Sequence, residues 1–89
     1  MVERSDEYII GRLIERSRLL IALSDEIPVE TKLQTQPLLK QLEQALAVPP
    51  AEQDTGRVRA TWAALYADLQ DYADLEALLS AMKTFLPYL

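Results

Sequence analysis

The stretch GRVRATWAALYADLQDYADLEALLSAMKTFL, residues 56–86, decides the fold of this chain. After its first residue it contains no glycine or proline, and its large apolar side chains return at steps of three and four residues. That spacing marks one face of an α-helix. The stretch therefore predicts a long helical region with a single apolar seam, made of Val58, Trp62, Leu65, Leu69, Tyr72, Leu75, Leu79, Met82 and Leu86.

The seam has one residue fewer than its repeat requires between Tyr72 and Leu75. At about 100° per residue, this deficit rotates the later half of the seam by roughly a quarter turn relative to the earlier half. A straight helix would point the two halves in different directions. We therefore expect either a break near Asp71–Asp74, where both aspartates can act as N-caps, or a helix that wraps around its partners.

A first helix precedes this region near the start of the chain. Ser5 is a suitable N-cap, and apolar residues at helical spacing follow it as far as Ile21. The helix should end at Leu23 or Ser24, because Ile27 precedes a proline and the residue before a proline avoids helical backbone angles.

The second helical region lies between Pro28 and Val48 and is interrupted by Pro37. We favour a helix from Pro37 to about Ala47 after a loosely helical approach, because proline suits the first position of a helix. The alternative is one longer helix with a kink at Pro37. The apolar stripe of this region begins at Val29 and Leu33 and continues through Leu38 or Leu39, Leu42 and Leu46.

Residues 48–55, VPPAEQDT, form the clearest loop, since the paired prolines stop a helix and Asp54 or Thr55 can cap the next one. No strand-like alternation of apolar and polar residues bounded by turns occurs in the chain. We expect one all-α domain over residues 1–89. It should be an antiparallel helical bundle of three to four helical segments, with the last region as its longest helix.

The composition restricts the chemistry that this protein can perform. Its 89 residues include no cysteine and no histidine, which excludes zinc sites, Ser-His-Asp triads and Cys-His pairs. Fourteen acidic residues against nine basic ones give a net charge of −5 and argue against nucleic-acid binding. No apolar run approaches the roughly 18 residues of a membrane span. We expect a cytoplasmic protein that binds no cofactor, metal or membrane.

Two sets of charged residues are candidates for a metal site and for an anion-binding surface. Asp68, Asp71 and Asp74, with Glu76, can share a helix edge and hold a divalent ion, but a solvated face with capping aspartates is the favoured interpretation. The arginines can bind an anionic partner, but acidic residues near them in the sequence neutralise much of their charge; they are Arg12, Arg16, Arg18, Arg57 and Arg59. We expect no catalytic residue.

A second row of residues lies almost opposite the seam and consists mainly of alanines. Alanine is a good helix former, and small side chains also let a neighbouring helix approach closely, here from another subunit. The ending FLPYL either folds back over the bundle, which we favour, or docks onto a partner. The interface candidates are Ala60, Ala63, Tyr66, Ala67, Ala77, Ala81, Phe85 and Tyr88.

The runs TQPLLKQLEQALAVPP, residues 35–50, and WAALYADLQDYADLEALL, residues 62–79, resemble small helical proteins of cyanobacteria. One such group is implicated in the negative regulation of heterocyst differentiation. The likeness lies in size, acidity and composition over the whole chain and includes no diagnostic residue, so it transfers no functional residues. It implies a regulator of a developmental programme.

These patterns predict a non-catalytic protein–protein interaction or regulatory protein that forms a homodimer. The first alternative is a nucleic-acid-binding regulator that uses the arginines of the first helix. The second is a small carboxylate-based or metal-dependent enzyme, which needs further acidic residues brought beside Asp68 and Asp71.

Overall fold

The structure is a computed structural model that describes residues 6–89. Within that range the chain forms four α-helices and one short 3-10 turn: α1 (Asp6–Leu23), α2 (Val29–Leu46), η1 (Pro50–Glu52), α3 (Thr55–Leu69) and α4 (Ala73–Phe85). The end of α1 at Leu23 is where the sequence predicts it. Ser5, the expected N-cap of this helix, lies outside the described residues.

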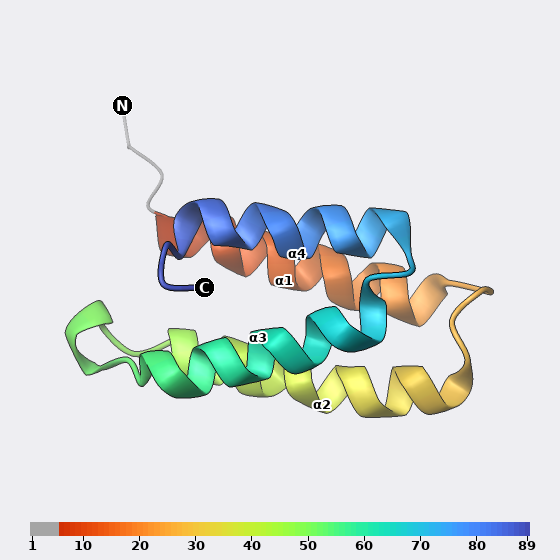
Figure 1. Cartoon of the computed structure of the whole chain (residues 1–89), viewed down its shortest axis with the longest axis horizontal. Helices are drawn as coiled ribbons and strands as arrows, with labels where there is room; N and C mark the ends of the chain where they lie inside the picture. Colours follow the sequence, from red (N-terminus) through yellow and green to blue (C-terminus); the bar gives the residue numbers. More distant parts are fainter. Residues whose placement is uncertain (1–5) are drawn as a thin grey trace.

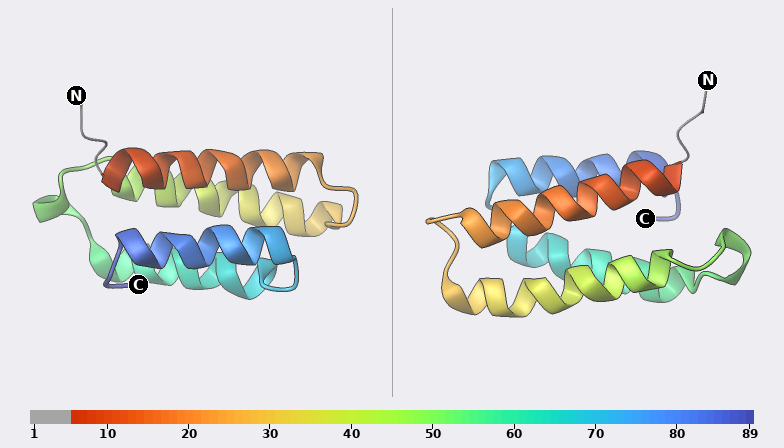
Figure 2. Two further views of the ribbon diagram at one scale, coloured as in Figure 1. Left: turned by 90° about the horizontal axis from the view of Figure 1, so that it is seen from above. Right: turned by 180° about the vertical axis from the view of Figure 1, so that it is seen from behind.

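The four helices run alternately in opposite directions and pack into a bundle (Figure 1). Helix α1 packs on α4 and α2 on α3, and the chain neighbours α1 and α2, and α3 and α4, also touch. Each helix therefore occupies one corner, with α1 diagonal to α3 (Figure 2). The predicted all-α antiparallel bundle is confirmed, in its four-segment form.

The core takes one apolar face from each helix, and the seam read from residues 56–86 supplies most of it. Every seam residue is buried except Tyr72, which is half-buried. The other helices contribute Ile10, Ile14, Ile21, Leu39 and Leu42, together with Ile27 from the loop between them. The seam prediction is confirmed, because a long run of helical spacing must bury its apolar face to be stable in water.

Two hydroxyl groups inside this core are satisfied within their own helices. Ser17 Oγ donates to the carbonyl oxygen of Leu13, and Thr35 Oγ1 to that of Thr31, each at 2.8 Å. Among the described residues no buried side-chain nitrogen or oxygen lacks a hydrogen-bond partner. The core therefore holds no unsatisfied polar group that would point to a bound ligand.

Helix α2 is continuous from Val29 to Leu46 with Pro37 inside it, so the favoured helix start at Pro37 is wrong. Proline removes the N–H that would bond to the carbonyl of Leu33. Both Leu33 and Pro37 are exposed, so water can satisfy that carbonyl from the outer side of the helix. Burial of Leu39 and Leu42 on the inner side then holds the helix together through the proline.

The long region breaks between Leu69 and Ala73, as the missing residue in the seam indicates. The predicted caps are wrong, because the N-cap of α4 is Tyr72 and makes no side-chain cap bond, while Asp74 lies in the first turn. The break leaves α3 and α4 with 15 and 13 residues against 18 each for α1 and α2, so the third region is not the longest helix.

The start of α3 follows the sequence prediction. Asp54 is the N-cap, and its Oδ1 accepts a hydrogen bond from the backbone N–H of Arg57 at 3.1 Å. The loop before it contains the turn η1, which the sequence analysis did not anticipate. No helix within residues 6–89 is long and apolar enough to cross a membrane.

Candidate functional site

The carboxylates of the candidate metal or catalytic site lie apart from one another and on the surface. Asp68, Asp71 and Asp74 are exposed and belong to the end of α3, the turn and the start of α4. The fourth carboxylate, Glu76, accepts two hydrogen bonds within the chain. They come from Tyr66 Oη at 3.2 Å and from Ser80 Oγ at 2.7 Å. Among the described residues, no group of three or more acidic side chains is placed to hold a metal ion.

The arginines do not form one basic face. Arg18 is neutralised by ion pairs with Glu15 of its own helix and Glu43 of α2. Arg12 and Arg16 lie on α1, whereas Arg57 and Arg59 lie on α3, the diagonally opposite helix. A nucleic-acid surface requires clustered cations, so this separation weakens that alternative.

The most exposed apolar side chains lie where α1 and α2 meet. Leu19 and Leu23 of α1 are 52% and 78% exposed, and Val29 and Leu33 of α2 are 66% and 70% exposed. Lys32 Nζ donates to the carbonyl oxygen of Ala22 at 3.3 Å, which ties the start of α2 to the end of α1. We call Leu19, Leu23, Val29 and Leu33 the hairpin surface.

The hairpin surface contradicts the expected apolar stripe of α2, because Val29 and Leu33 were predicted to lie on it with Leu42 and are exposed. At about 100° per residue, Leu33 lies roughly 120° around the helix from Leu39, which is buried. On one continuous helix this spacing places Leu33 on the outer side, whereas a helix that begins at Pro37 leaves the position of Leu33 undetermined.

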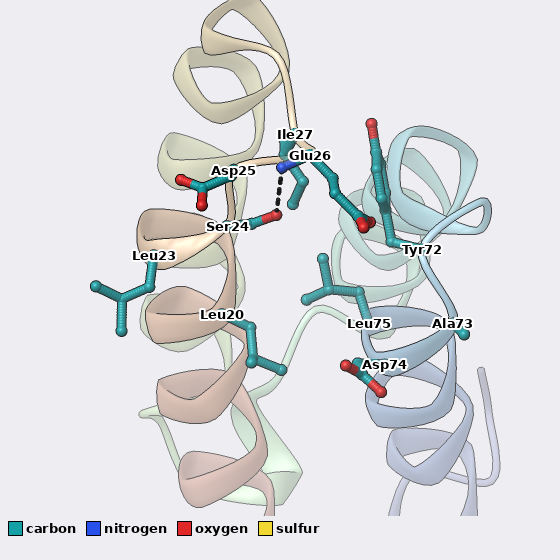
Figure 3. A pocket seen from close by; sticks show the side chains of 10 residues that line it. All are labelled: Leu20, Leu23, Ser24, Asp25, Glu26, Ile27, Tyr72, Ala73, Asp74 and Leu75. Atoms are coloured by element: carbon teal, nitrogen blue, oxygen red, sulfur yellow. Dashed lines mark hydrogen bonds between the residues drawn. The ribbon is translucent and has the colours of Figure 1, made fainter.

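A groove opens between the end of α1 and the start of α4, with a volume of about 460 Å³ (Figure 3). Leu20 and Leu75 point toward each other across it, and the carboxylates of Glu26 and Asp74 lie near its mouth. Asp25, in the same loop as Glu26, points away from it. The groove thus combines apolar walls with an acidic mouth.

Negative charge is concentrated at this end of the bundle. Residues 19–33 and 68–82 contain seven acidic side chains and one basic one, Lys32, whose Nζ donates to the carbonyl oxygen of Ala22. These two segments include the α1–α2 loop and the α3–α4 turn, which lie at the same end (Figure 1). We call it the acidic end, and its acidic residues are Asp25, Glu26, Glu30, Asp68, Asp71, Asp74 and Glu76.

The predicted alanine row is divided between two helices. Ala60, Ala63 and Ala67 are exposed on α3, whereas Ala77 and the half-exposed Ala81 belong to α4, which runs back in the opposite direction. Lys83 of α4 lies over the ring of Trp62 on α3. Ala81 is about 160° from Lys83 in the helix, so it lies on the side of α4 that is next to α1.

Tyr66 is half-buried by contacts within the chain. Its ring stacks on Trp62 with centroids 5.1 Å apart, and its hydroxyl donates to Glu76. The hydrogen bond to Glu76, followed by desolvation and the negative charge of Glu76, raises the pKa of Tyr66, and a hydrogen bond with Ser80 partly opposes the rise. Tyr66 therefore links α3 to α4.

The ending of the chain folds back on the bundle, as favoured. Leu86 is buried, and Phe85, Tyr88 and Leu89 are partly buried against the core. Tyr88 Oη donates to Gln53 Oε1 at 3.2 Å, and burial raises the pKa of Tyr88. This segment closes the end of the bundle opposite the acidic end (Figure 1).

Comparison with known proteins finds no matching family model, no matching curated protein and no matching solved structure.

Proposed function

We propose that this chain is a non-catalytic protein–protein interaction protein that regulates a partner by occupying its surface, and that it forms a homodimer. The observation that carries the interaction role is the hairpin surface, whose four large apolar side chains are all more than half exposed. Burial of apolar surface contributes about 25 cal/mol per Å², and large apolar patches on soluble proteins mark binding sites.

Hydrogen bonds join the two helices that carry the hairpin surface. Besides the Lys32 bond to Ala22, Gln36 Nε2 donates to the carbonyl oxygen of Arg18 at 3.4 Å, so α1 and α2 are joined along this edge. Leu19 and Leu23 lie one turn apart, as do Val29 and Leu33. A partner that lies across the edge would contact both pairs.

The two alternative functions have less support. A nucleic-acid-binding regulator would need the arginines of α1 and α3 on one face, and they lie on diagonal helices. A carboxylate-based enzyme would need acidic side chains that converge on a substrate, and the described acidic residues make no such cluster. The regulatory role that the cyanobacterial resemblance implies is compatible with a binding protein that performs no chemistry.

Site-specific photo-cross-linking in the source cells tests the interaction role. A photoreactive residue replaces Leu19 or Leu33 of the hairpin surface, or, as a matched control, Gln41, which is exposed elsewhere on α2. We expect a discrete heavier product from both hairpin positions and none from Gln41. A folded, expressed protein that gives no product from either hairpin position would contradict the proposal.

A further inference from the structure

The groove between α1 and α4 has apolar walls that reach down to the core. Ile27 and Leu75, which line it, are 4% and 2% exposed, and Leu20 and Tyr72 are half-buried beside them (Figure 3). Its volume of about 460 Å³ lies within the roughly 300–1,000 Å³ of ligand-binding clefts. The groove can therefore take up apolar side chains of a partner and remove them from water.

Two carboxylates at the mouth of this groove have no cation of the chain beside them. Glu26 comes from the α1–α2 loop and Asp74 from the first turn of α4, and both side chains are exposed (Figure 3). Within residues 6–89, ion pairs join Arg18 to Glu15 and Glu43 only. An occupant that presents lysine or arginine here gains two attractive contacts, whereas an acidic occupant is repelled.

Most of the net charge of the chain lies at the acidic end, where the groove opens. Residues 19–33 and 68–82 carry seven acidic side chains and one basic one, so their net charge is −6. The remaining residues carry seven acidic and eight basic side chains, with a net charge of +1. Charge of one sign around a groove with low-dielectric walls attracts a partner of the opposite sign. The preferred partner at this end is therefore basic.

A second copy of this chain does not supply such a partner. Its arginines within residues 6–89 lie on α1 and α3, and the apolar sides of these helices, with residues such as Ile14 and Leu65, are buried in its own core. A two-fold contact between two acidic ends would also oppose like charges. The occupant of the groove is therefore a different protein.

We propose that the groove binds a helix of another protein that is apolar on one side and carries lysine or arginine beside that apolar side. Its apolar side chains lie against Leu20 and Leu75, and its cations lie at Glu26 and Asp74. Helices commonly dock in grooves of this kind, because their apolar side chains recur on one side. Leu23 both lines the groove and belongs to the hairpin surface, so one partner can cover both. This partner specifies the proposed interaction function, on which the inference rests.

A fluorescent peptide of about 18 residues, about 27 Å long as a helix, is the probe. It carries leucines at helical spacing on one side and lysines at the other positions, and fluorescence anisotropy gives its Kd. Glu26→Gln with Asp74→Asn should weaken binding about 10-fold, since two exposed ion pairs are lost. Glu26→Gln alone changes no helix and should weaken binding about 3-fold.

Glu30→Gln with Asp68→Asn is the matched control, because it makes the same changes at exposed positions of the acidic end that do not line the groove. It should change the Kd less than about 2-fold, since charges more than about 8 Å away are screened at physiological salt. A second peptide of the same composition, with its leucines spread around the helix, cannot bury them together and should bind at least about 10-fold more weakly.

Four results overturn the inference. They are no binding of the first peptide at about 100 μM, equal Kd values for the two peptides, equal losses in the groove variant and its matched control, and displacement of the peptide by an equal concentration of spermine, which would indicate a site for free cations. Cross-linking from Leu19 and Leu33 reports on the interaction function itself. Failure of the groove with intact cross-linking therefore contradicts this inference alone, whereas absent cross-links contradict the proposed function.

Discussion

The indole Nε1 of Trp62 on α3 donates a hydrogen bond to the carbonyl oxygen of Leu79 on α4, at 3.1 Å and in a buried position. Lys83 Nζ lies 4.8 Å from the centroid of the same ring, and the ring of Tyr66, one turn later in α3, stacks on it. Trp62 thus attaches α4 to α3 beyond the break between them. This attachment fixes which side of α4 packs on α3 and which side is left for α1.

The first prediction concerns this bond. Trp62→Phe keeps an aromatic ring but leaves the carbonyl of Leu79 without its side-chain donor, so the free energy of unfolding should fall by about 1–3 kcal/mol. Urea unfolding measures the change. Lys83→Met, which removes only the exposed cation over the ring, should cost less than about 1 kcal/mol. Equal losses in the two variants would show that the hydrogen bond contributes nothing of its own.

The second prediction concerns the proline inside α2. Pro37→Ala restores a backbone N–H for the carbonyl of Leu33 and should raise the free energy of unfolding by about 2–2.6 kcal/mol. Proline inside a helix costs about 3 kcal/mol relative to alanine, and its restriction of the unfolded chain offsets about 0.4–1 kcal/mol of that.

Thermal and urea unfolding check this value. Pro28→Ala is the control, because Pro28 is the N-cap of α2 and interrupts no bond inside the helix, so it should bring no comparable gain. A less stable Pro37→Ala protein would mean that the bundle requires the shape of α2 that proline imposes.

The third region shows what the sequence could predict. Its seam runs over many turns, so the burial of residues such as Leu65 and Leu69 follows from spacing alone. The missing residue before Leu75 predicted a break there as one of two outcomes, because a straight helix would point the two halves of the seam in different directions. Spacing did not predict the cap, because Tyr72 occupies the N-cap position without a side-chain hydrogen bond and Asp74 lies inside the first turn.

Helix α2 shows where local rules were insufficient. Pro37 carries a local preference to begin a helix, but burial of Leu39 and Leu42 together with contacts to α1 and α3 outweighs it. The exposed position of Leu33 follows only when α2 is one continuous helix through Pro37. The hairpin surface, which includes Leu33, follows from the same condition. The pairing of α1 with α4 depends on contacts between distant segments, which helical spacing does not encode.

The third prediction concerns the pH dependence of the α3–α4 link. The pKa of Tyr66 is raised, foremost by its hydrogen bond to Glu76, so the folded protein favours the protonated phenol. The stabilisation is therefore fully present below about pH 10, the ordinary tyrosine value, and is lost as the pH rises through the raised pKa. The stability difference between wild type and Tyr66→Phe should shrink over that alkaline range.

Urea unfolding at pH 8 and at pH 11 measures that difference, and phenolate absorbance follows the ionisation. Glu76→Gln removes the negative charge that disfavours the phenolate, so the absorbance change assigned to Tyr66 should move to lower pH. An alkaline titration that is the same in the wild type and in Glu76→Gln would show that Tyr66 does not feel this carboxylate.

The last prediction separates the two groups of alanines as dimer surfaces. Ala63→Arg with Ala67→Arg places two large cations on the exposed side of α3, whereas Ala77→Arg with Ala81→Arg places them on α4 beside the partly exposed, apolar Leu78. Arginine is a good helix former, so circular dichroism should show both proteins folded. Light scattering at tens of micromolar, about the range in which standard interfaces stay associated, should then find the α3 variant dimeric and the α4 variant monomeric. The reverse pattern would place the subunit contact on the alanines of α3.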